Sequence, residues 1–438
     1  MRRLVLALVL LLAPLPAAAL DIERVVSPGG IEAWLVEEHS NPILALSFSF
    51  LGGSALDPVG KEGRARMATA LLDEGAGPLD SQAFQGELQR LSIELSFAVT
   101  DDELTGSMVM LTEHRQRAAE LLTLALHEPR FDSEPVERVR AQLSVRVSRR
   151  ATDPQSLAYE KLQQQIFADH PYGRSAEGTI ESLAAITIED LRAYVGQRLA
   201  LGTLKIGVVG DITPEELGAL LDRIFGGLPQ ESPPIELTEA ELPAEGSLTV
   251  LQLPVPQSVV FMAQPGPKRD DPDYYAAAVL NHILGGGTFA SRLYAEVREA
   301  RGLAYGVWSD LVDRERAGLW MAGAATQNAR VAETLAVMRE VWTDLATAGP
   351  TAAEVRDAIT YLTGSFALRL ASSQGIARIL VSVQRDALGI DYLDRRDQFF
   401  EAVTPEQVTR VAQQWLDPDR LVVVVAGQPE GLEAAPAN

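Results

Sequence analysis

The chain has 438 residues, of which 47% are hydrophobic and 22% charged, a composition typical of a globular protein with room for roughly two or three domains. Its formal net charge of −22 argues against binding to nucleic acid or to anionic membrane surfaces, because like charges repel. The chain contains no cysteine, which excludes disulfides and a lipid-modified cysteine.

Residues 1–19 have the pattern of a secretory signal peptide. Arg2 and Arg3 form a positive n-region, Leu4–Leu12 forms an apolar core, and Ala17–Ala19 offers a small-residue cleavage site. The apolar core is too short for a stable anchor, and no later segment is apolar for long enough to span a bilayer. We therefore predict a bacterial protein that is periplasmic or secreted after removal of the signal peptide, with no stable membrane span.

The first half of the chain begins with strand patterns and continues with long helical patterns. Alternating or continuous apolar residues predict strands at 31–36, 44–50 and 103–110. Apolar residues at helical spacing predict helices at 113–127, 134–150 and 155–167.

The second half repeats this plan. Strands are predicted at 248–253, 259–262, 305–312 and 319–325, the last two as a hairpin. A helix is predicted at 272–284, followed by four helices between about residues 328 and 415. Strands followed by a run of helices predict an α+β fold, in which each half has a mostly antiparallel sheet with helices packed on one face.

An internal repeat supports a duplication. Residues 186–191 match residues 403–408, and residues 204–210 match residues 421–427, both pairs 217 positions apart. Each copy reads as a helix cap, an amphipathic helix and a buried strand that ends in glycine, and the match across both elements needs no gap. The stretch 228–246 is rich in proline and acidic residues, as linkers are. We therefore predict two domains, at 21–227 and 247–430, joined by this linker.

The first motif with chemical meaning is a glycine-rich frame around a short helix, at Gly52–Pro58, Gly63 and Gly75. The frame resembles the active-site region of the pitrilysin/insulinase-type zinc peptidases, in which such a loop leads into a helix with the motif His-x-x-Glu-His. The residues at those three positions here are Arg66, Thr69 and Ala70, none of which serves as a zinc ligand or a good general base.

The remaining ligands of the resembling site are missing as well. The family takes a further carboxylate from a later helix, but the only acidic residue between Arg138 and Tyr159 is Asp153, in an Asp-Pro turn. None of the five histidines lies three or four residues from another. We therefore expect no metal site in this chain and no peptide hydrolysis by the chain alone.

A second motif, at 285–305, resembles the signature of the family's second domain. In that signature an arginine and a tyrosine seven residues apart reach toward the zinc site, and here they are Arg298 and Tyr305. A guanidinium can hold a substrate carbonyl or carboxylate, and a tyrosine hydroxyl can donate a hydrogen bond to an oxyanion. The nearby Arg292 and Arg301 are expected to form structural salt bridges.

The triplet Gly285, Gly286 and Gly287 opens this motif. It lacks the lysine and spacing of a phosphate-binding loop. It resembles, in shortened form, the glycine-rich loop of the non-catalytic subunit of the mitochondrial processing peptidase, which implies contact with a peptide substrate. A plain hinge or turn is the alternative, since glycine serves both purposes.

The resemblance implies that this chain is the non-catalytic subunit of a heterodimeric zinc peptidase. A homologous partner with His-x-x-Glu-His would hold the zinc, and this chain would contribute Arg298 and Tyr305 to the hydrolysis of peptides. The alternative is a structural or peptide-binding homologue without a catalytic role.

Overall fold

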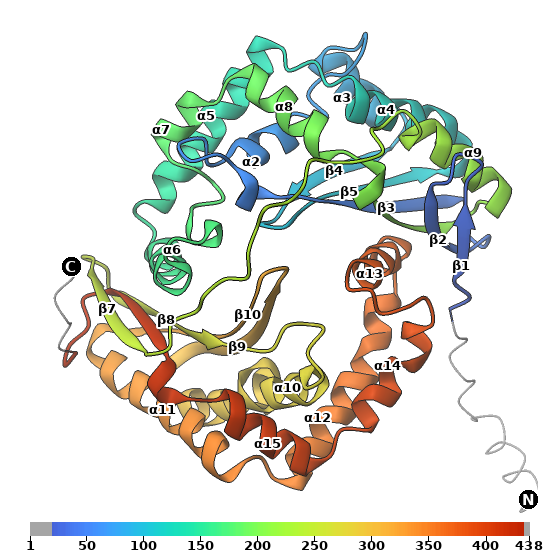
Figure 1. The fold of residues 1–438 in the computed structure, drawn as a ribbon. Coiled ribbons are helices and arrows are strands. Elements are labelled where there is room, and N and C mark those ends of the chain that lie inside the picture. The colour runs from blue at the N-terminus through green and yellow to red at the C-terminus, as the bar shows by residue number, and fades with distance from the viewer. Residues whose placement is uncertain (1–19, 433–438) are drawn as a thin grey trace, which may run out of the picture.

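The computed structural model describes residues 20–432, so the predicted signal peptide, residues 1–19, lies outside the described residues. The described part of the chain forms two mixed sheets, one above the other, each with helices packed against it (Figure 1). This agrees with the predicted α+β class of two sheet-plus-helix units.

The first sheet has six strands, and all but one of its neighbouring pairs are antiparallel. The exception is the parallel pair of β2 and β6. In sheet order the strands are β1 (Glu23–Val26), β2 (Glu32–Glu37), β6 (Lys205–Gly210), β3 (Ile43–Leu51), β5 (Glu103–Leu111) and β4 (Glu94–Val99).

The second sheet has five strands and the same pattern of directions. Only the pair of β7 and β11 is parallel. In sheet order the strands are β7 (Ser247–Gln252), β11 (Val422–Gly427), β8 (Gln257–Pro265), β10 (Ala317–Gln327) and β9 (Ala304–Arg314). β11 is buried on both faces, which explains why it is a continuous run of valines and not an alternating strand.

Most helices cover the outer face of the sheet of their own half, where they bury the two largest apolar clusters. On the first sheet they are α2 (Arg64–Thr69), α3 (Ser81–Arg90), α4 (Arg115–His127), α5 (Ser133–Arg150), α7 (Ile180–Ala185), α8 (Ile188–Arg198) and α9 (Pro214–Phe225). On the second sheet they are α10 (Tyr274–Asn281), α11 (Val331–Ala348), α12 (Ala352–Gly364), α14 (Tyr392–Glu401) and α15 (Pro405–Trp415).

Two helices are exchanged between the halves. α6 (Pro154–Phe167) belongs to the first half but packs on β8 and β11 of the second sheet, where Leu162 is fully buried. α13 (Ser373–Arg385) belongs to the second half but packs on β3 and β6 of the first sheet, where Leu380 is fully buried (Figure 1). Each half thus packs most of its own helices on the outer face of its sheet, and the inner face is covered by a helix of the other half.

The duplication is visible in the element boundaries. The pair α8 and β6 recurs as α15 and β11 with every boundary shifted by 217 residues, from 188 to 405 and from 205 to 422. Both helices begin at a threonine that forms a capping box, Thr187 and Thr404. Apart from β1, the strand orders of the two sheets also correspond. Between residues 328 and 415 the structure has five α-helices, one more than predicted.

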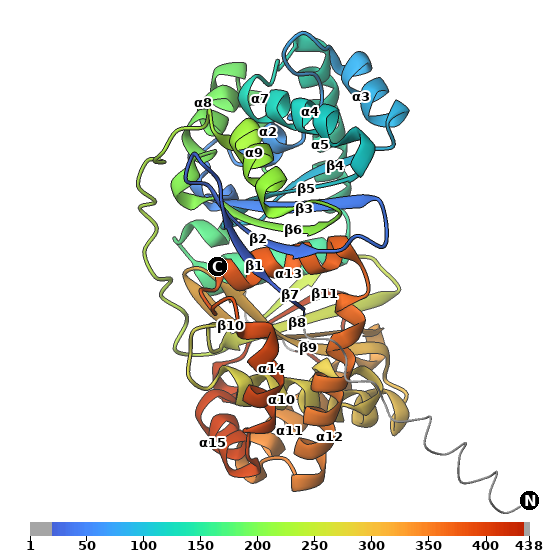
Figure 2. The same ribbon diagram turned by 90° about the vertical axis from the view of Figure 1, so that its right-hand side faces the viewer.

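Residues 228–246 form no helix or strand and run along one side of the molecule from the first sheet to the second (Figure 2). Within residues 20–432, no single helix is long and apolar enough to cross a membrane. One pair, Ala352–Leu370 and Ser373–Arg385, passes by length and composition but is bent by 119°.

Candidate functional site

The loop before α2 anchors the start of that helix through Asp57. Its carboxylate accepts hydrogen bonds from the backbone N–H groups of Gly63 and Ala65, both at 3.0 Å, and from Arg64 Nε at 3.3 Å. Gly63 has φ +90°, and a Cβ there would lie 2.9 Å from the carbonyl oxygen of Glu177. Burial raises the pKa of Asp57 to about 6 despite the neighbouring guanidinium. The frame of the first motif therefore has a structural role.

An ion cluster takes the place of metal ligands on α2. Arg66 pairs with Glu177 at 3.0 Å, and Arg146 of α5 lies 3.7 Å from the same carboxylate. Thr69 is buried, and Ala70 ends the helix. Because a guanidinium fills this space and carries no lone pair, these residues do not fit a zinc ion. Within residues 20–432 no group of three histidine, aspartate or glutamate side chains could hold a metal.

The sequence did not point to Glu177. It lies on the loop between Pro171–Gly173 and α7, and its contact with α2 and α5 arises only from the packing of these segments. The sequence shows that the end of α5 carries no acidic residue. It does not show which other segment supplies the carboxylate that pairs with Arg66.

The structure brings Arg298 and Tyr305 together. Arg298 lies on the π-helix Tyr294–Glu299, and its guanidinium carbon is 4.5 Å from the ring centre of Tyr305 and 4.9 Å from that of Tyr294. Tyr305 is at the start of β9 and is 84% exposed. Gly302, with φ +58°, reverses the chain between them. Arg298 forms no ion pair with any described residue.

The two neighbouring arginines have the structural role that was predicted for them. Arg292 holds Glu354 of α12 with two hydrogen bonds of 2.7 and 2.8 Å. This pairing lowers the pKa of Glu354 to about 2. Arg301, in the turn after the helix Tyr294–Glu299, pairs with Glu296 of that helix.

Two glycines of the triplet are helical, and the third follows the helix in a turn. Gly285 and Gly286 lie in the π-helix His282–Gly286, which continues α10, and none of the three glycines has a positive φ. A Cβ at Gly285 would lie 2.5 Å from the backbone nitrogen of Ser309, and one at Gly287 would lie 2.6 Å from the carbonyl oxygen of His282. Gly285 thus allows the close packing of this helix against β9, whereas a side chain at Gly287 would collide with the helix itself.

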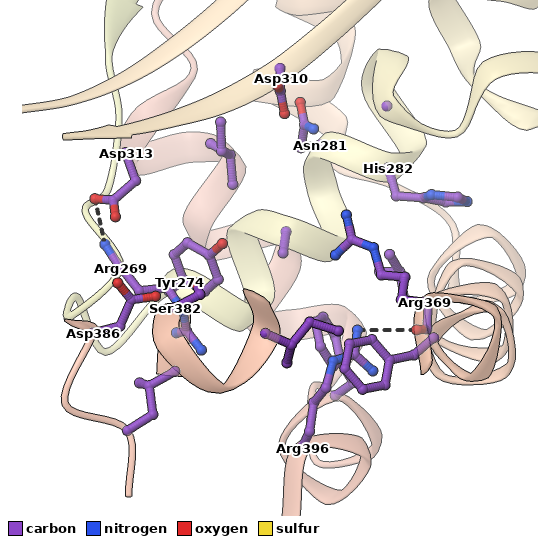
Figure 3. A pocket seen from close by; sticks show the side chains of 18 of the residues that line it. Arg269, Tyr274, Asn281, His282, Asp310, Asp313, Arg369, Ser382, Asp386 and Arg396 are labelled. Carbon is purple, nitrogen blue, oxygen red and sulfur yellow. Dashed lines mark hydrogen bonds between the residues drawn. The ribbon is translucent and has the colours of Figure 1, made fainter. Parts of the chain in front are cut away.

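A cavity of about 810 Å³ lies beside the triplet and is lined by Gly285 and Gly286 (Figure 3). Its walls come from α10, β9, the segment Ser365–Leu370, α13 and α14. Arg369 and Asp310 line it without an ion pair to any residue of the range 20–432. His282, another lining residue, stacks on Tyr361, and burial lowers its pKa. Nothing in the sequence indicated this cavity, because its residues come from five separate segments.

The two motifs lie on different units. Arg66, Thr69 and Ala70 are on α2 above the first sheet, whereas Arg298 and Tyr305 are beside β9 of the second sheet (Figure 1).

Comparisons with known proteins point to one family. The sequence profile of the family described as "Peptidase M16 inactive domain" matches residues 185–362. The "Non-peptidase homolog YmxG" of Helicobacter pylori is 27% identical over 338 residues, which are 76% of this chain and 77% of that protein. An "Uncharacterized zinc protease" of Mycobacterium leprae is 27% identical over 407 residues, or 92% of this chain and 91% of that protein.

A solved structure points to the same family. The crystal structure of a peptidase M16 inactive domain from Pseudomonas fluorescens is 28% identical, has a TM-score of 0.88, and covers 96% of this chain and 100% of that one. The resemblance read from the two motifs is therefore confirmed: residues 185–362 match the inactive domain of the M16 peptidase family, and nearly the whole chain is similar to the Pseudomonas fluorescens structure.

Proposed function

We propose that this chain is the non-catalytic subunit of a periplasmic, heterodimeric zinc peptidase. Its homologous partner would carry His-x-x-Glu-His and the zinc, and peptides would be cleaved between the two subunits. The match to an inactive domain supports a role without hydrolysis by this chain alone. So does the ion cluster of Arg66, Glu177 and Arg146 on α2, which leaves no room for a metal.

The observation that carries the proposal is the exposed pair of Arg298 and Tyr305. A tyrosine that is 84% exposed contributes little to the core, and its hydroxyl has no hydrogen-bond partner in the described chain. The guanidinium of Arg298 lies over the ring of Tyr305, so a positive charge and a hydroxyl group are presented side by side. In a complex, Arg298 would hold a carbonyl or carboxylate of the peptide, and Tyr305 would donate to the oxyanion at the scissile carbonyl.

The cavity beside Gly285 and Gly286 would accept part of the same peptide. It is of the size that binds drug-sized ligands in other proteins, and it presents both a cation, Arg369, and an anion, Asp310. Two of the three predicted substrate-binding glycines line it, so this part of the proposal requires no rearrangement of the helix.

The test is co-expression with a homologous His-x-x-Glu-His protein from the same genome, followed by kinetics of the purified pair. Tyr305→Phe should lower kcat by about 10²-fold or more with a small change in KM, since only the oxyanion contact is lost. Arg298→Ala should lower kcat/KM. The matched controls are Tyr361→Phe, an exposed tyrosine on α12, and Arg301→Ala, and both should leave activity unchanged.

The alternative is a structural or peptide-binding homologue without a catalytic role. The similarity to the Helicobacter pylori protein named as a non-peptidase homolog favours it. Under this alternative, Arg298→Ala and Tyr305→Phe would both leave the activity of the pair unchanged, or no active pair would form. The predicted export is tested separately, by the N-terminal sequence of the mature protein in a periplasmic fraction.

A further inference from the structure

A second cavity, of about 380 Å³, lies between the inner face of the first sheet and α13. The sheet side of this cavity, which we call the hydroxyl pocket, is lined by four hydroxyl side chains on three neighbouring strands: Ser47 on β3, Ser96 on β4, and Thr105 and Ser107 on β5. It lies apart from Arg298, Tyr305 and the glycine triplet, none of which lines it.

The duplication shows what the second copy has at the same place. In the first sheet Ser47, Ser107 and Ser96 form one cross-strand row. The row extends to Gly207 of β6, which corresponds to Val424 of β11 in the ungapped repeat. From Val424, the equivalent row of the second sheet runs through Phe261, Gly323 and Trp308.

Aromatic side chains fill this place in the second copy. Trp308 lies over Gly323, where an added Cβ would meet the indole ring at 2.9 Å. Phe261 packs edge-on against Trp308 with ring centres 6.0 Å apart. The second copy therefore has aromatic groups at this place, with Trp308 38% exposed at the wall of the cavity of about 810 Å³, whereas the first copy has three serines.

One polar group of the hydroxyl pocket, Ser47, is not satisfied within the described chain, whereas Ser107 also accepts a hydrogen bond from Gln374 at 3.5 Å and Thr105 donates to the carbonyl of Ala98 at 3.5 Å. Ser47 is 3% exposed, and its Oγ is buried without a hydrogen-bond partner among residues 20–432. Ser96 and Ser107 share one hydrogen bond of 2.9 Å. A buried hydroxyl without a partner is uncommon in native proteins and points to a missing hydrogen-bonding group.

The pocket also carries an uncompensated positive charge. Arg378 of α13 lines it and forms no ion pair or hydrogen bond through its side chain within the described residues. The other charged lining residues, Arg385 and Glu103, pair with each other at 2.8 Å. Arg378 is exposed to solvent and lines the pocket, so its guanidinium is available to a bound anion.

We propose that the hydroxyl pocket binds a small ligand through an oxyanion group, a carboxylate or a phosphate. Arg378 supplies the charge, and the serine hydroxyls donate hydrogen bonds to the oxygens. The volume fits a group of the size of a dipeptide end or a phosphate ester and excludes a folded partner.

The experiment is calorimetric titration of the full mature chain with three probes: inorganic phosphate, N-acetyl-alanyl-alanine, and the C-terminal amide of that dipeptide. We expect one of the two anions to bind and the amide not to bind. Binding of phosphate alone would assign a phosphoryl group, and binding of the dipeptide acid alone would assign a carboxylate.

Variants place the binding in the pocket. Arg378→Gln should weaken it by about tenfold or more, whereas Arg149→Gln, an exposed arginine of α5, should not change it. Ser96→Trp, which copies the second sheet, should abolish binding, and the milder Ser47→Ala should weaken it if the tryptophan variant fails to fold. The proposal is wrong if neither anion binds, if the amide binds as well as the acid, or if Arg378→Gln and Arg149→Gln bind alike.

Discussion

The charged motif residues are paired inside the chain in the first copy of the fold, whereas in the second copy Arg298 lies unpaired within the described residues, beside an exposed tyrosine. In the first copy Arg66 and Arg146 both face Glu177, and the cluster closes the space between α2 and α5. In the second copy Arg298 stacks on Tyr305, which is 84% exposed, and neither is held by a carboxylate of the described chain. Charges paired inside the chain hold segments of the fold together, whereas groups left open at a surface are available to another molecule.

The two copies also depend on each other. Each inner sheet face is covered by the exchanged helix of the other half, α13 on the first sheet and α6 on the second. Removing one copy would expose an apolar face of the other, so the two should unfold in one transition.

The largest effect should come from the exchanged helices. Leu162→Ala in α6 and Leu380→Ala in α13 each delete a fully buried side chain and should lower the free energy of unfolding by about 2–5 kcal/mol. Urea unfolding followed by circular dichroism measures this. The control is Val145→Ala, an exposed position on α5 with an expected change below about 0.5 kcal/mol. Two separate transitions in either variant would contradict the coupling of the copies.

The pH dependence of stability should have opposite signs in the two copies. Burial raises the pKa of Asp57 from 3.8 to about 6, so folding favours its protonated form and stability falls as the pH rises between these values. The contribution is about 2–3 kcal/mol, at about 1.4 kcal/mol per pH unit. Glu354, whose pKa is lowered to about 2 by Arg292, adds stability that is lost only as the pH falls from its ordinary value of 4.5 toward 2.

Asp57→Asn isolates the first of these terms. Between about pH 4 and about pH 6, the free energy of unfolding of the wild type should fall relative to that of the variant. The reason is that only the wild type has a buried carboxyl that must ionise in this interval. Glu354→Gln should leave the upper part of that interval, from about pH 5 to about pH 6, unchanged. A difference that does not vary with pH would show that Asp57 is ionised throughout.

The sequence predicted the parts of the fold that depend on local pattern. The helices at α4, α5 and α6 and the strands at β3, β5, β9 and β10 all lie where apolar periodicity placed them, and the repeat of 217 residues holds to each boundary. The exchange of α6 and α13 was missed, because an amphipathic helix buries the same face on either sheet. β4 was missed because only Val99 among its residues is buried.

The sequence likewise predicted only part of the candidate site. The motif placed Arg298 and Tyr305 near each other because seven residues span one turn between a helix and a strand. Glu177 and the lining of both cavities come from segments far apart in the chain, which no spacing rule connects. The helical state of Gly285 and Gly286 was missed because glycine is a poor helix former on its own, and packing against β9 overrides this preference.

A moderate effect is expected from the ion cluster of the first copy. Glu177→Gln leaves Arg66 and Arg146 facing each other without a carboxylate and should cost about 1–3 kcal/mol, since the side chain of Glu177 is only 14% exposed. Asp391→Asn, which breaks an exposed pair with Arg395 on α14, should cost less than about 1 kcal/mol. Equal losses in thermal unfolding would mean that the cluster on α2 has no special structural role.

The smallest effect on stability should come from the pair of the second copy. Tyr305→Phe in the isolated chain should change the free energy of unfolding by less than about 0.5 kcal/mol, because the hydroxyl bonds to nothing in the described structure. The matched control is Tyr194→Phe in the first copy, where the buried hydroxyl donates to the carbonyl of Gly52 at 3.0 Å and its loss should cost about 1–2 kcal/mol. If Tyr305→Phe is as costly as Tyr194→Phe, Tyr305 serves the fold, and its retention no longer supports a role toward a second subunit.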